Sequence, residues 1–182
     1  MQQIRRHCMY AVYLAKHKWY VFYCGVKTGA SLWRLVIHDW SKFSIAEWKP
    51  YVDFFYSHHQ GNKRGEKADY QEGRTPEVKA AFIRAFHHHI HRNPHHCEYW
   101  LRYKANDGTF TPLEMPEKFV REMVADWAAT GKVITGTWDL TDWYLSNKDK
   151  IKLHPKSRQL TEALISKLMN KLNPEALDYA SA

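Results

Sequence analysis

The segment RLVIHDWSKFS, residues 34–44, changes from an apolar run to polar side chains in a single step. Residues 35–37 lead toward a core, yet His38 and Asp39 follow them, and such side chains are rarely buried without partners. Ser31 can cap a short helix that ends at these two residues. We therefore expect other parts of the chain to fold around His38 and Asp39 and to supply those partners.

Helical periodicity extends over most of the chain. Apolar residues recur at steps of three and four, the spacing of one helical face. We predict helices over residues 8–27, 31–39, 44–57, 75–93, 116–130 and 157–170, with a helix restarting near residue 95 and a further segment over 138–151. No strand pair is expected, and residues 105–115 should form a loop.

Capping residues and glycines set these boundaries. Ser44 and Glu47 form the Ser-x-x-Glu pattern of a capping box, and Thr75 precedes a proline, as in many helix starts. Glycines mark helix exits at Gly25, Gly29 and Gly131. The patterns predict an all-α fold, a compact helical bundle in one domain over residues 1–182. Its core covers about residues 8–130, and a C-terminal helical extension covers about 138–172.

The charge balance favours an anionic partner. Lys and Arg number 27 against 19 acidic residues, a formal net charge of +8, which suits a nucleotide-like substrate and also nucleic acid. Cys8, Cys24 and Cys97 include no CxxC pair and suit a reducing compartment. No apolar stretch of about 18 residues and no leader is visible. We expect a cytoplasmic protein without a membrane partner, and a homo-oligomer remains open.

Four predicted helices carry a metal-type ligand where an apolar stripe would have Leu or Val. These residues are His17, Asp39, His89 and Asp126. A lone inward histidine is often a hydrogen-bonded core residue, and Asp126 alone could be partly exposed, but four such residues together favour a common cause. Burying a carboxylate is costly unless a cation compensates it. The stripes therefore predict a shared divalent metal site between helices.

The order of these residues resembles the H…HD…D pattern of the HD-domain superfamily of metal-dependent phosphohydrolases. His17 is followed by His38-Asp39, then by further histidines and by Asp126, and HDWSKF is similar to the superfamily's HD-x-x-K. The stretch AFHHHIHRNPHHCEYW, residues 85–100, resembles a phage and bacterial branch with an H-x-x-x-N-x-H-H stretch. The Gly-Tyr-Pro signature of cyclic-di-nucleotide phosphodiesterases is absent.

The resemblance implies a ligand set. One divalent ion would be held by His17, His38, Asp39 and Asp126. His89, with His95 and His96, would hold a second ion bridged through Asp39, although His95 and His96 could instead orient a ligand or face the substrate. Mixed imidazole and carboxylate ligands suit Mn, Fe, Co, Ni or Zn. Paired ions can activate water and stabilise a leaving oxygen, which favours phosphoester hydrolysis.

Catalytic roles are predicted for Asp39, Lys42 and His95. Lys42 could neutralise a phosphate oxygen, or could be a solvated lysine at a helix end. The polar segment 57–74 is predicted to be a long mobile loop, of the kind that often forms a lid.

Other residues near these candidates have two interpretations. In the polar segment, Lys63, Arg64 and Lys67 could guide an anion or be a solvated charged face. Surface or pocket-rim positions are expected for His87, His88 and His91. Five tryptophans flank the ligands and are expected mostly in the core, although they could stack on a base: Trp19, Trp40, Trp48, Trp100 and Trp127. Glu47 and Glu98 are interpreted as helix caps or surface pairs, with proton transfer as the alternative.

Three functions follow from these interpretations. The leading hypothesis is a metal-dependent phosphohydrolase that acts on a nucleotide or a cyclic nucleotide. A metal-dependent nuclease is the second, because HRNPHH superficially resembles an HNH motif, but that motif needs a β-hairpin before its helix. A non-catalytic, metal-stabilised binding protein is the third.

Overall fold

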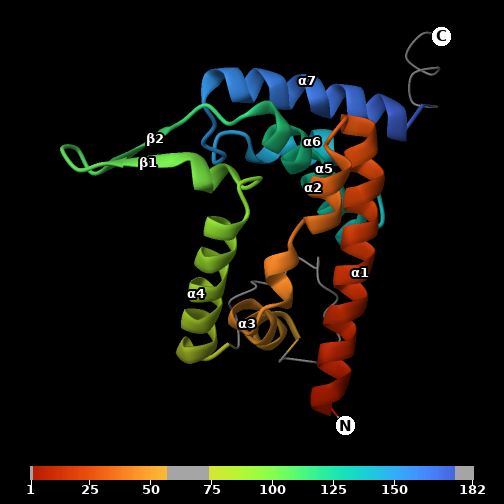
Figure 1. Cartoon of the computed structure of the whole chain (residues 1–182), viewed down its shortest axis with the longest axis vertical. Coiled ribbons are helices and arrows are strands. Elements are labelled where there is room, and N and C mark those ends of the chain that lie inside the picture. The colour runs from red at the N-terminus through yellow and green to blue at the C-terminus, as the bar shows by residue number, and fades with distance from the viewer. Residues whose placement is uncertain (1, 57–73, 175–182) are drawn as a thin grey trace.

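The computed structural model describes residues 2–56 and 74–174, and this part of the chain is mainly helical (Figure 1). The α-helices are α1 (Gln2–Thr28), α2 (Leu32–Ile37), α3 (Ile45–Tyr56), α4 (Pro76–Arg92), α5 (Glu117–Thr135), α6 (Leu140–Asn147) and α7 (Pro155–Leu172). Short 3-10 helices are η1 (Trp40–Phe43) and η2 (Cys97–Trp100). The all-α prediction is confirmed. Among the described helices, none is both long enough and apolar enough to cross a membrane.

Helix α1 runs along one side of the molecule and packs against α5 (Figure 1). Its buried stripe is the predicted one: Tyr10, Leu14, His17, Val21 and Cys24. Of the two glycines expected at the exit, Gly29 is confirmed, since the helix continues to Thr28 and turns at Gly29, where φ is +76°. Gly25 instead lets α2 approach closely, since a Cβ there would lie 2.2 Å from Leu35 Cδ2.

Replacing Gly25 with alanine should therefore destabilise the fold. The added methyl would clash with the buried Leu35 side chain, and overpacking of this kind costs about 1–3 kcal/mol. Urea unfolding should show a lower free energy of unfolding. The matched control is Gly131→Ala, also within a helix, where the nearest atom to the added Cβ lies 3.7 Å away. That variant should be neutral or more stable, and equal losses in both would contradict this account of α1–α2 packing.

The link from α2 to α3 differs from the predicted caps. Ser31 makes no side-chain capping bond, and α2 ends at Ile37, so His38 and Asp39 follow the helix rather than close it. The capping box is wrong as well. The Oγ of Ser44 has no hydrogen-bond partner, and the Glu47 side chain contacts histidines of α4 instead.

Helices α4 and α5 begin where predicted, but α5 ends later than expected. Thr75 caps α4 by accepting a hydrogen bond from the Val78 amide, and α4 ends at Arg92. α5 continues past Gly131 to Thr135 and stops at Gly136, where φ is +82°. Val133 in this last turn packs against the core around Tyr10 and Val52, which helps to hold the helix past the internal glycine.

The helix predicted near His95 is present only as the short η2, and a β-hairpin follows it where a loop and no strand pair were predicted. β1 (Leu101–Lys104) pairs antiparallel with β2 (Thr109–Pro112), with Tyr103 opposite Phe110. The turn holds Asp107-Gly108, a strong hairpin signal that the helical interpretation overlooked, and Gly108 has a φ of +68°. The hairpin projects from the body of the molecule (Figure 1).

Two main apolar cores lie on either side of the candidate ligands. One joins α1, α3 and α4 through residues such as Tyr10, Val52 and Ala85. The other joins α5, α6 and α7 through residues such as Met123 and Leu164. The C-terminal helices therefore share a core with α5.

Candidate metal centre

Asp39 lies between α2 and η1 in an unusual backbone conformation. Its φ of 55° makes it the only residue other than glycine with a positive φ among residues 2–56 and 74–174. Its side chain is 1% exposed. Such strain is often retained at functional sites because it aims a side chain. Here the turn points the carboxylate into the space between the helices.

One oxygen of Asp39 faces the first group of predicted ligands. Its Oδ2 lies 3.4 Å from His17 Nε2 of α1 and 3.4 Å from His38 Nε2. Asp126 of α5 completes the group, with its Oδ1 lying 3.2 Å from His17 Nε2 and 3.5 Å from His38 Nε2. All four residues are buried, and their ligand atoms lie within 4.8 Å of one another. The predicted set of His17, His38, Asp39 and Asp126 thus meets in space.

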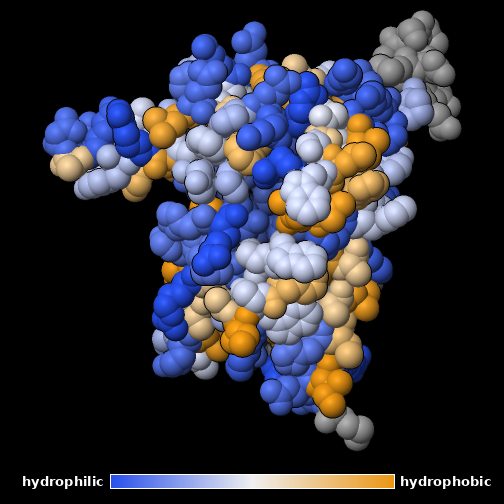
Figure 2. All heavy atoms as spheres, viewed as in Figure 1, coloured by the Kyte–Doolittle hydropathy of each residue, from blue (hydrophilic) through white to orange (hydrophobic). Residues whose placement is uncertain are grey.

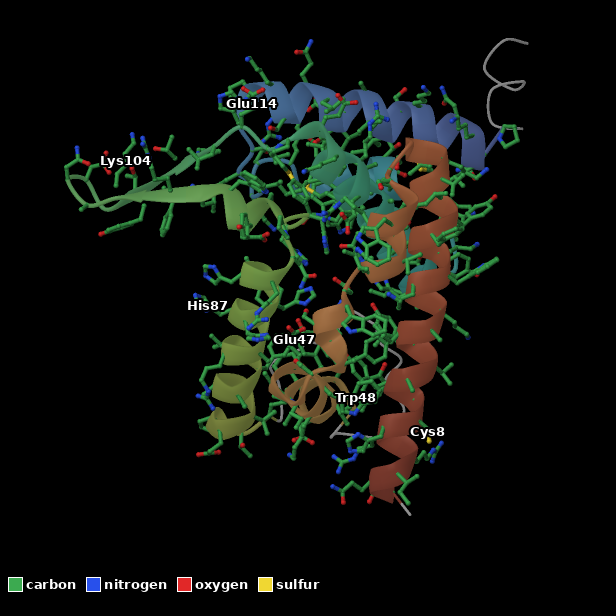
Figure 3. All side chains as sticks on the ribbon, viewed as in Figure 1. Cys8, Glu47, Trp48, His87, Lys104 and Glu114 are labelled. Atoms are coloured by element: carbon green, nitrogen blue, oxygen red, sulfur yellow. The ribbon has the colours of Figure 1, made fainter. Side chains whose placement is uncertain are left out.

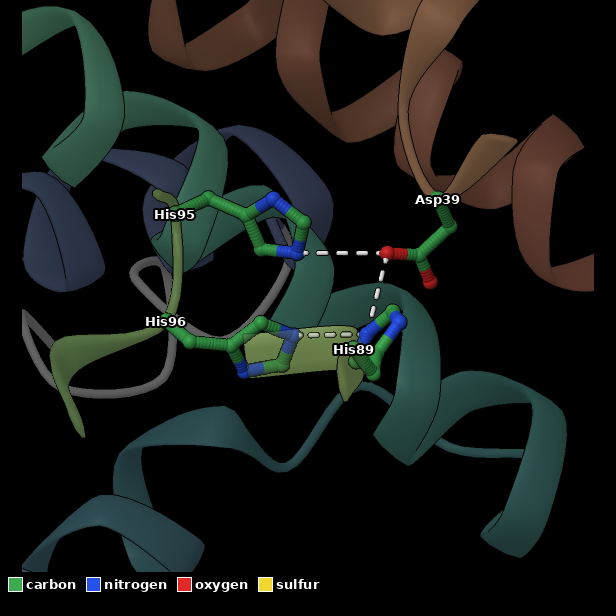
Figure 4. A group of neighbouring side chains, drawn as sticks. All are labelled: Asp39, His89, His95 and His96. Atoms are coloured by element: carbon green, nitrogen blue, oxygen red, sulfur yellow. Dashed lines mark hydrogen bonds and ion pairs between the residues drawn. The ribbon is translucent and has the colours of Figure 1, made fainter. Parts of the chain in front are cut away.

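The other oxygen of Asp39 faces the second group (Figure 4). Its Oδ1 lies 3.3 Å from His89 Nε2 and 3.4 Å from His95 Nε2. His96 joins this group, and its Nε2 lies 2.9 Å from His89 Nε2. These four residues also offer ligand atoms within 4.8 Å of one another. The two oxygens of one carboxylate are therefore divided between two sets of imidazoles.

These spacings fit a divalent metal. Ligand atoms about 2.1 Å from a common ion lie roughly 3.0–3.4 Å apart in octahedral or tetrahedral geometry, close to the N···O distances around Asp39. Several of the atoms also lack hydrogen-bond partners although they are buried: both ring nitrogens of His17, His38 Nε2, His95 Nε2 and Asp39 Oδ1. Buried polar atoms are normally satisfied. A cation would satisfy the inward-facing ones, so the residues present fit the predicted group.

Glu122 orients two of the histidines from behind, and the sequence analysis missed it. The Nδ1 atoms of His38 and His95 lie 2.9 and 3.3 Å from Glu122 Oε1, while Arg34 Nε donates to Oε2 at 2.6 Å. A hydrogen bond at Nδ1 leaves Nε2 free to bind a metal. Glu122 precedes Asp126 by four residues, one helical turn, so this spacing could have revealed it.

Glu47 has the same role toward His89. It is fully buried, and its two oxygens lie 2.8 Å from His89 Nδ1 and 2.7 Å from His88 Nδ1. Figure 3 shows Glu47 between α3 and α4. Asn93 adds a bond from its Nδ2 to the His89 carbonyl at 2.8 Å. The expectation of a helix cap or surface pair for Glu47 is therefore wrong.

The electrostatic environment keeps the carboxylates charged. Burial alone would raise the pKa of Asp39, but His38, Lys42 and His89 outweigh it and hold that pKa well below its usual range. Burial likewise opposes ionisation of Glu122, yet its hydrogen bonds with His38 and His95 lower its pKa to about 2. Burial also lowers the pKa of His96 well below 6.5, which keeps that ring neutral and able to act as a ligand.

Lys42 contacts the centre directly. Its Nζ donates to Asp39 Oδ2 at 2.5 Å, and its side chain is 12% exposed. Burial opposes its charge, but Asp39 raises the pKa of Lys42 above its usual value. The interpretation as a solvated helix-end lysine is therefore wrong.

A cavity of about 520 Å³ opens beside the centre. Three of the predicted residues, His89, His96 and Asp126, lie in its wall together with Lys42. Most of the remaining wall is aromatic: Tyr13, Tyr51, Phe55, Phe82, Phe86, Trp127, Trp138 and Trp143. His95, by contrast, is 1% exposed and does not line this cavity. The cavity can hold a flat or apolar group next to the candidate ligands.

Other predicted residues lie elsewhere. His87 and His91 are exposed and contact each other, with their Nε2 atoms 3.0 Å apart, and Figure 3 shows His87 pointing away from the bundle. Glu98 is exposed and accepts a bond from Cys97 Sγ at 3.4 Å. The loop predicted over 57–74, with its basic residues, falls almost entirely outside the described residues: Lys63, Arg64 and Lys67.

Three of the five tryptophans are half-buried and pack against the apolar cores, as predicted for most of them: Trp48, Trp100 and Trp127. Trp19 and Trp40 are instead 66% and 65% exposed. Of these five, only Trp127 lines the cavity beside the centre.

Comparison with known proteins gives one match. A model of a family of unknown function, DUF5662, matches residues 6–167, a range that contains every candidate ligand. No curated protein and no solved structure matches the chain.

Proposed function

We propose a function from the site itself, because the chain belongs to the DUF5662 family, whose function is unknown. The proposal is a metal-dependent phosphohydrolase that acts on a nucleotide or cyclic-nucleotide phosphoester. The observation that carries the proposal is that the two carboxylate oxygens of Asp39 face different pairs of histidines. Its Oδ2 faces His17 and His38, and its Oδ1 faces His89 and His95. A carboxylate shared in this way is typical of paired-metal hydrolytic centres.

The resemblance to the HD-domain superfamily supports the same reaction. The residues that carry the resemblance are far apart in sequence, yet their side chains lie around one point between α1, α2 and α5: His17, His38, Asp39 and Asp126. Divalent ions at such a centre lower the pKa of water and withdraw charge from phosphoryl oxygens. Mn, Fe, Co, Ni and Zn all suit these nitrogen and oxygen donors.

The chain's own residues would then bind and orient the substrate. The aromatic wall of the cavity suits a nucleobase, since aromatic rings stack on bases. Lys42 lies at the junction of the cavity and Asp39, where its ammonium can pair with a phosphoryl oxygen. Glu47 and Glu122 fix the ring orientations through Nδ1, which limits motion of the ligands. His96, which borders the cavity, is better placed than His95 to contact the substrate.

The nuclease alternative gains nothing from the hairpin. An HNH site needs its hairpin before the helix that carries the motif, whereas β1 and β2 follow HRNPHH.

The direct test of the proposed function is a hydrolysis screen of the purified chain with Mn, Co, Ni and Zn against nucleotides, cyclic nucleotides and single-stranded DNA. The proposal requires metal-dependent release of phosphate or ring opening of a nucleotide, and cleavage of DNA alone would favour a nuclease.

Lys42→Ala should reduce hydrolysis without removing metal. We expect a loss of about ten-fold to a hundred-fold in kcat/KM, because the variant lacks a cation beside the phosphoryl group. Metal content should match that of the parent, since an ammonium cannot be a ligand. The control is Lys49→Ala, whose exposed side chain pairs with Asp53 on α3. A parental rate in Lys42→Ala would rule out this role.

A further inference from the structure

Helix α1 is apolar on its outer face as well as on its buried face. Seven exposed residues form this outer stripe: Ile4, Cys8, Ala11, Ala15, Trp19, Phe22 and Val26. Ile4, Trp19 and Val26 are 69%, 66% and 52% exposed. Figure 2 shows apolar residues along the edge of the molecule that α1 forms, and in Figure 3 Cys8 lies on the side of α1 away from Trp48.

The outer stripe is continuous, and the exposed apolar residues Val12 and Tyr23 lie beside it. At 100° per residue on an ideal helix, all seven side chains lie within about 40° of one direction. The buried residues of α1, such as Leu14 and His17, point to the other side. A helix that is apolar on both sides is normally covered on both. Within the described part of the chain, all seven side chains stay exposed, although the end of α5 borders the stripe at Ala15 and Trp19.

The outer stripe carries small side chains toward one end and large rings toward the other. Its steps of four, three, four, four, three and four residues are the same from either end, as on any ideal helix face centred on one residue, here Ala15. Reversal pairs Ile4 with Val26, Cys8 with Phe22, Ala11 with Trp19 and Ala15 with itself. Small residues thus face the two largest rings, whereas a parallel pair would place Trp19 against Trp19.

We propose that the outer stripe is the contact between two copies of this chain, with the two α1 helices antiparallel about a two-fold axis at Ala15. Two-fold contacts between identical chains need a self-complementary surface, and this stripe is one. The exposed side chains total on the order of 1,000 Å² over both copies, near the lower limit for a specific interface. The ligands of the metal centre lie on the opposite face of α1, so this proposal does not depend on the proposed function.

Because of the charges beside the stripe, a second copy of this chain and an acidic partner should bind with opposite dependence on salt. α1 contains five basic residues and no acidic residue. Two copies would therefore repel at their flanks while attracting at the stripe, and screening by salt should strengthen the dimer. An anionic membrane or an acidic protein would instead bind more weakly as salt is raised.

Disulfide cross-linking tests the arrangement directly. In a Cys8→Ala background, Ala15→Cys should form an intermolecular disulfide under mild oxidation, because the two-fold axis brings that position close to its own copy. Ile4→Cys alone should not cross-link, since its counterpart lies at the far end of the helix. The double variant Ile4→Cys with Val26→Cys should cross-link. A disulfide in Ile4→Cys alone would show parallel pairing and overturn the proposal.

Sedimentation equilibrium provides the second measurement. The parent should be a dimer at tens of micromolar, tighter in 0.5 M than in 0.1 M NaCl. Trp19→Glu combined with Phe22→Glu should weaken dimerisation at least a hundred-fold while metal content stays unchanged. The control is Val36→Glu, an equally exposed apolar position on α2, which should remain dimeric. A monomeric parent would overturn the proposal, and so would a monomer that binds phosphatidylserine vesicles through α1.

Discussion

Replacing Asp39 should remove the bound metal and abolish hydrolysis, the largest effect that we expect in this protein. Each oxygen of Asp39 lies within 3.4 Å of two imidazoles of one set, so its loss disrupts both positions at once. Asp126 Oδ2 lies farther, 3.9 Å, from His95 Nε2 of the second set. The loss should be at least about a hundred-fold, the upper end of what removing a supporting residue around a metal costs. Metal content per chain and turnover both report it.

The choice of variant separates loss of metal from loss of fold. Alanine is unfavourable at the φ of 55° that Asp39 adopts, whereas asparagine tolerates this conformation and keeps the shape of the side chain. Asp39→Asn should therefore retain the helical circular dichroism spectrum and still lose metal. The control is Asp142→Ala, an exposed aspartate of α6. Equal metal retention in Asp39→Asn and in this control would refute the assignment.

His89→Ala should show the second largest effect, and its neighbours in α4 should not. His89 is 1% exposed, contacts Asp39 through Nε2 and is held by Glu47 through Nδ1. Its loss should lower occupancy of the second metal position and hydrolysis by about ten-fold or more. His87→Ala and His91→Ala should stay near the parent, because both rings are exposed.

This comparison needs no knowledge of the substrate, since metal content can be measured directly. Glu47→Gln adds a test of orientation, because it keeps the shape but weakens the bond to His89 Nδ1, and it should give a smaller loss of the same kind. If His91→Ala lost the metal and His89→Ala kept it, the second metal position would be wrong.

The ligands could be predicted from sequence because helical periodicity determines which side chains share a face. His17, His89 and Asp126 each occupy an apolar stripe, so their inward direction followed from spacing alone. The local sequence cannot show which helices meet, and the resemblance to a known ligand order supplied that step.

The supporting carboxylates were missed for a different reason. Glu47 occupies the third position after Ser44 and therefore fits a capping box, but a buried histidine attracts its carboxylate more strongly than the helix end does. Gly25 was interpreted as a helix exit, yet tertiary packing against Leu35 explains it. Contacts between distant segments decided both cases, and a local pattern does not contain them.

The number of divalent ions bound per chain tests the central claim most directly. The purified chain is stripped with chelator, loaded with Mn or Co, freed of excess ion and measured by inductively coupled plasma mass spectrometry. The division of Asp39 between two ligand sets predicts about two ions in the parent, about one in His89→Ala and none in Asp39→Asn. A parent chain that is folded by circular dichroism and binds no divalent ion at micromolar concentration would contradict the account.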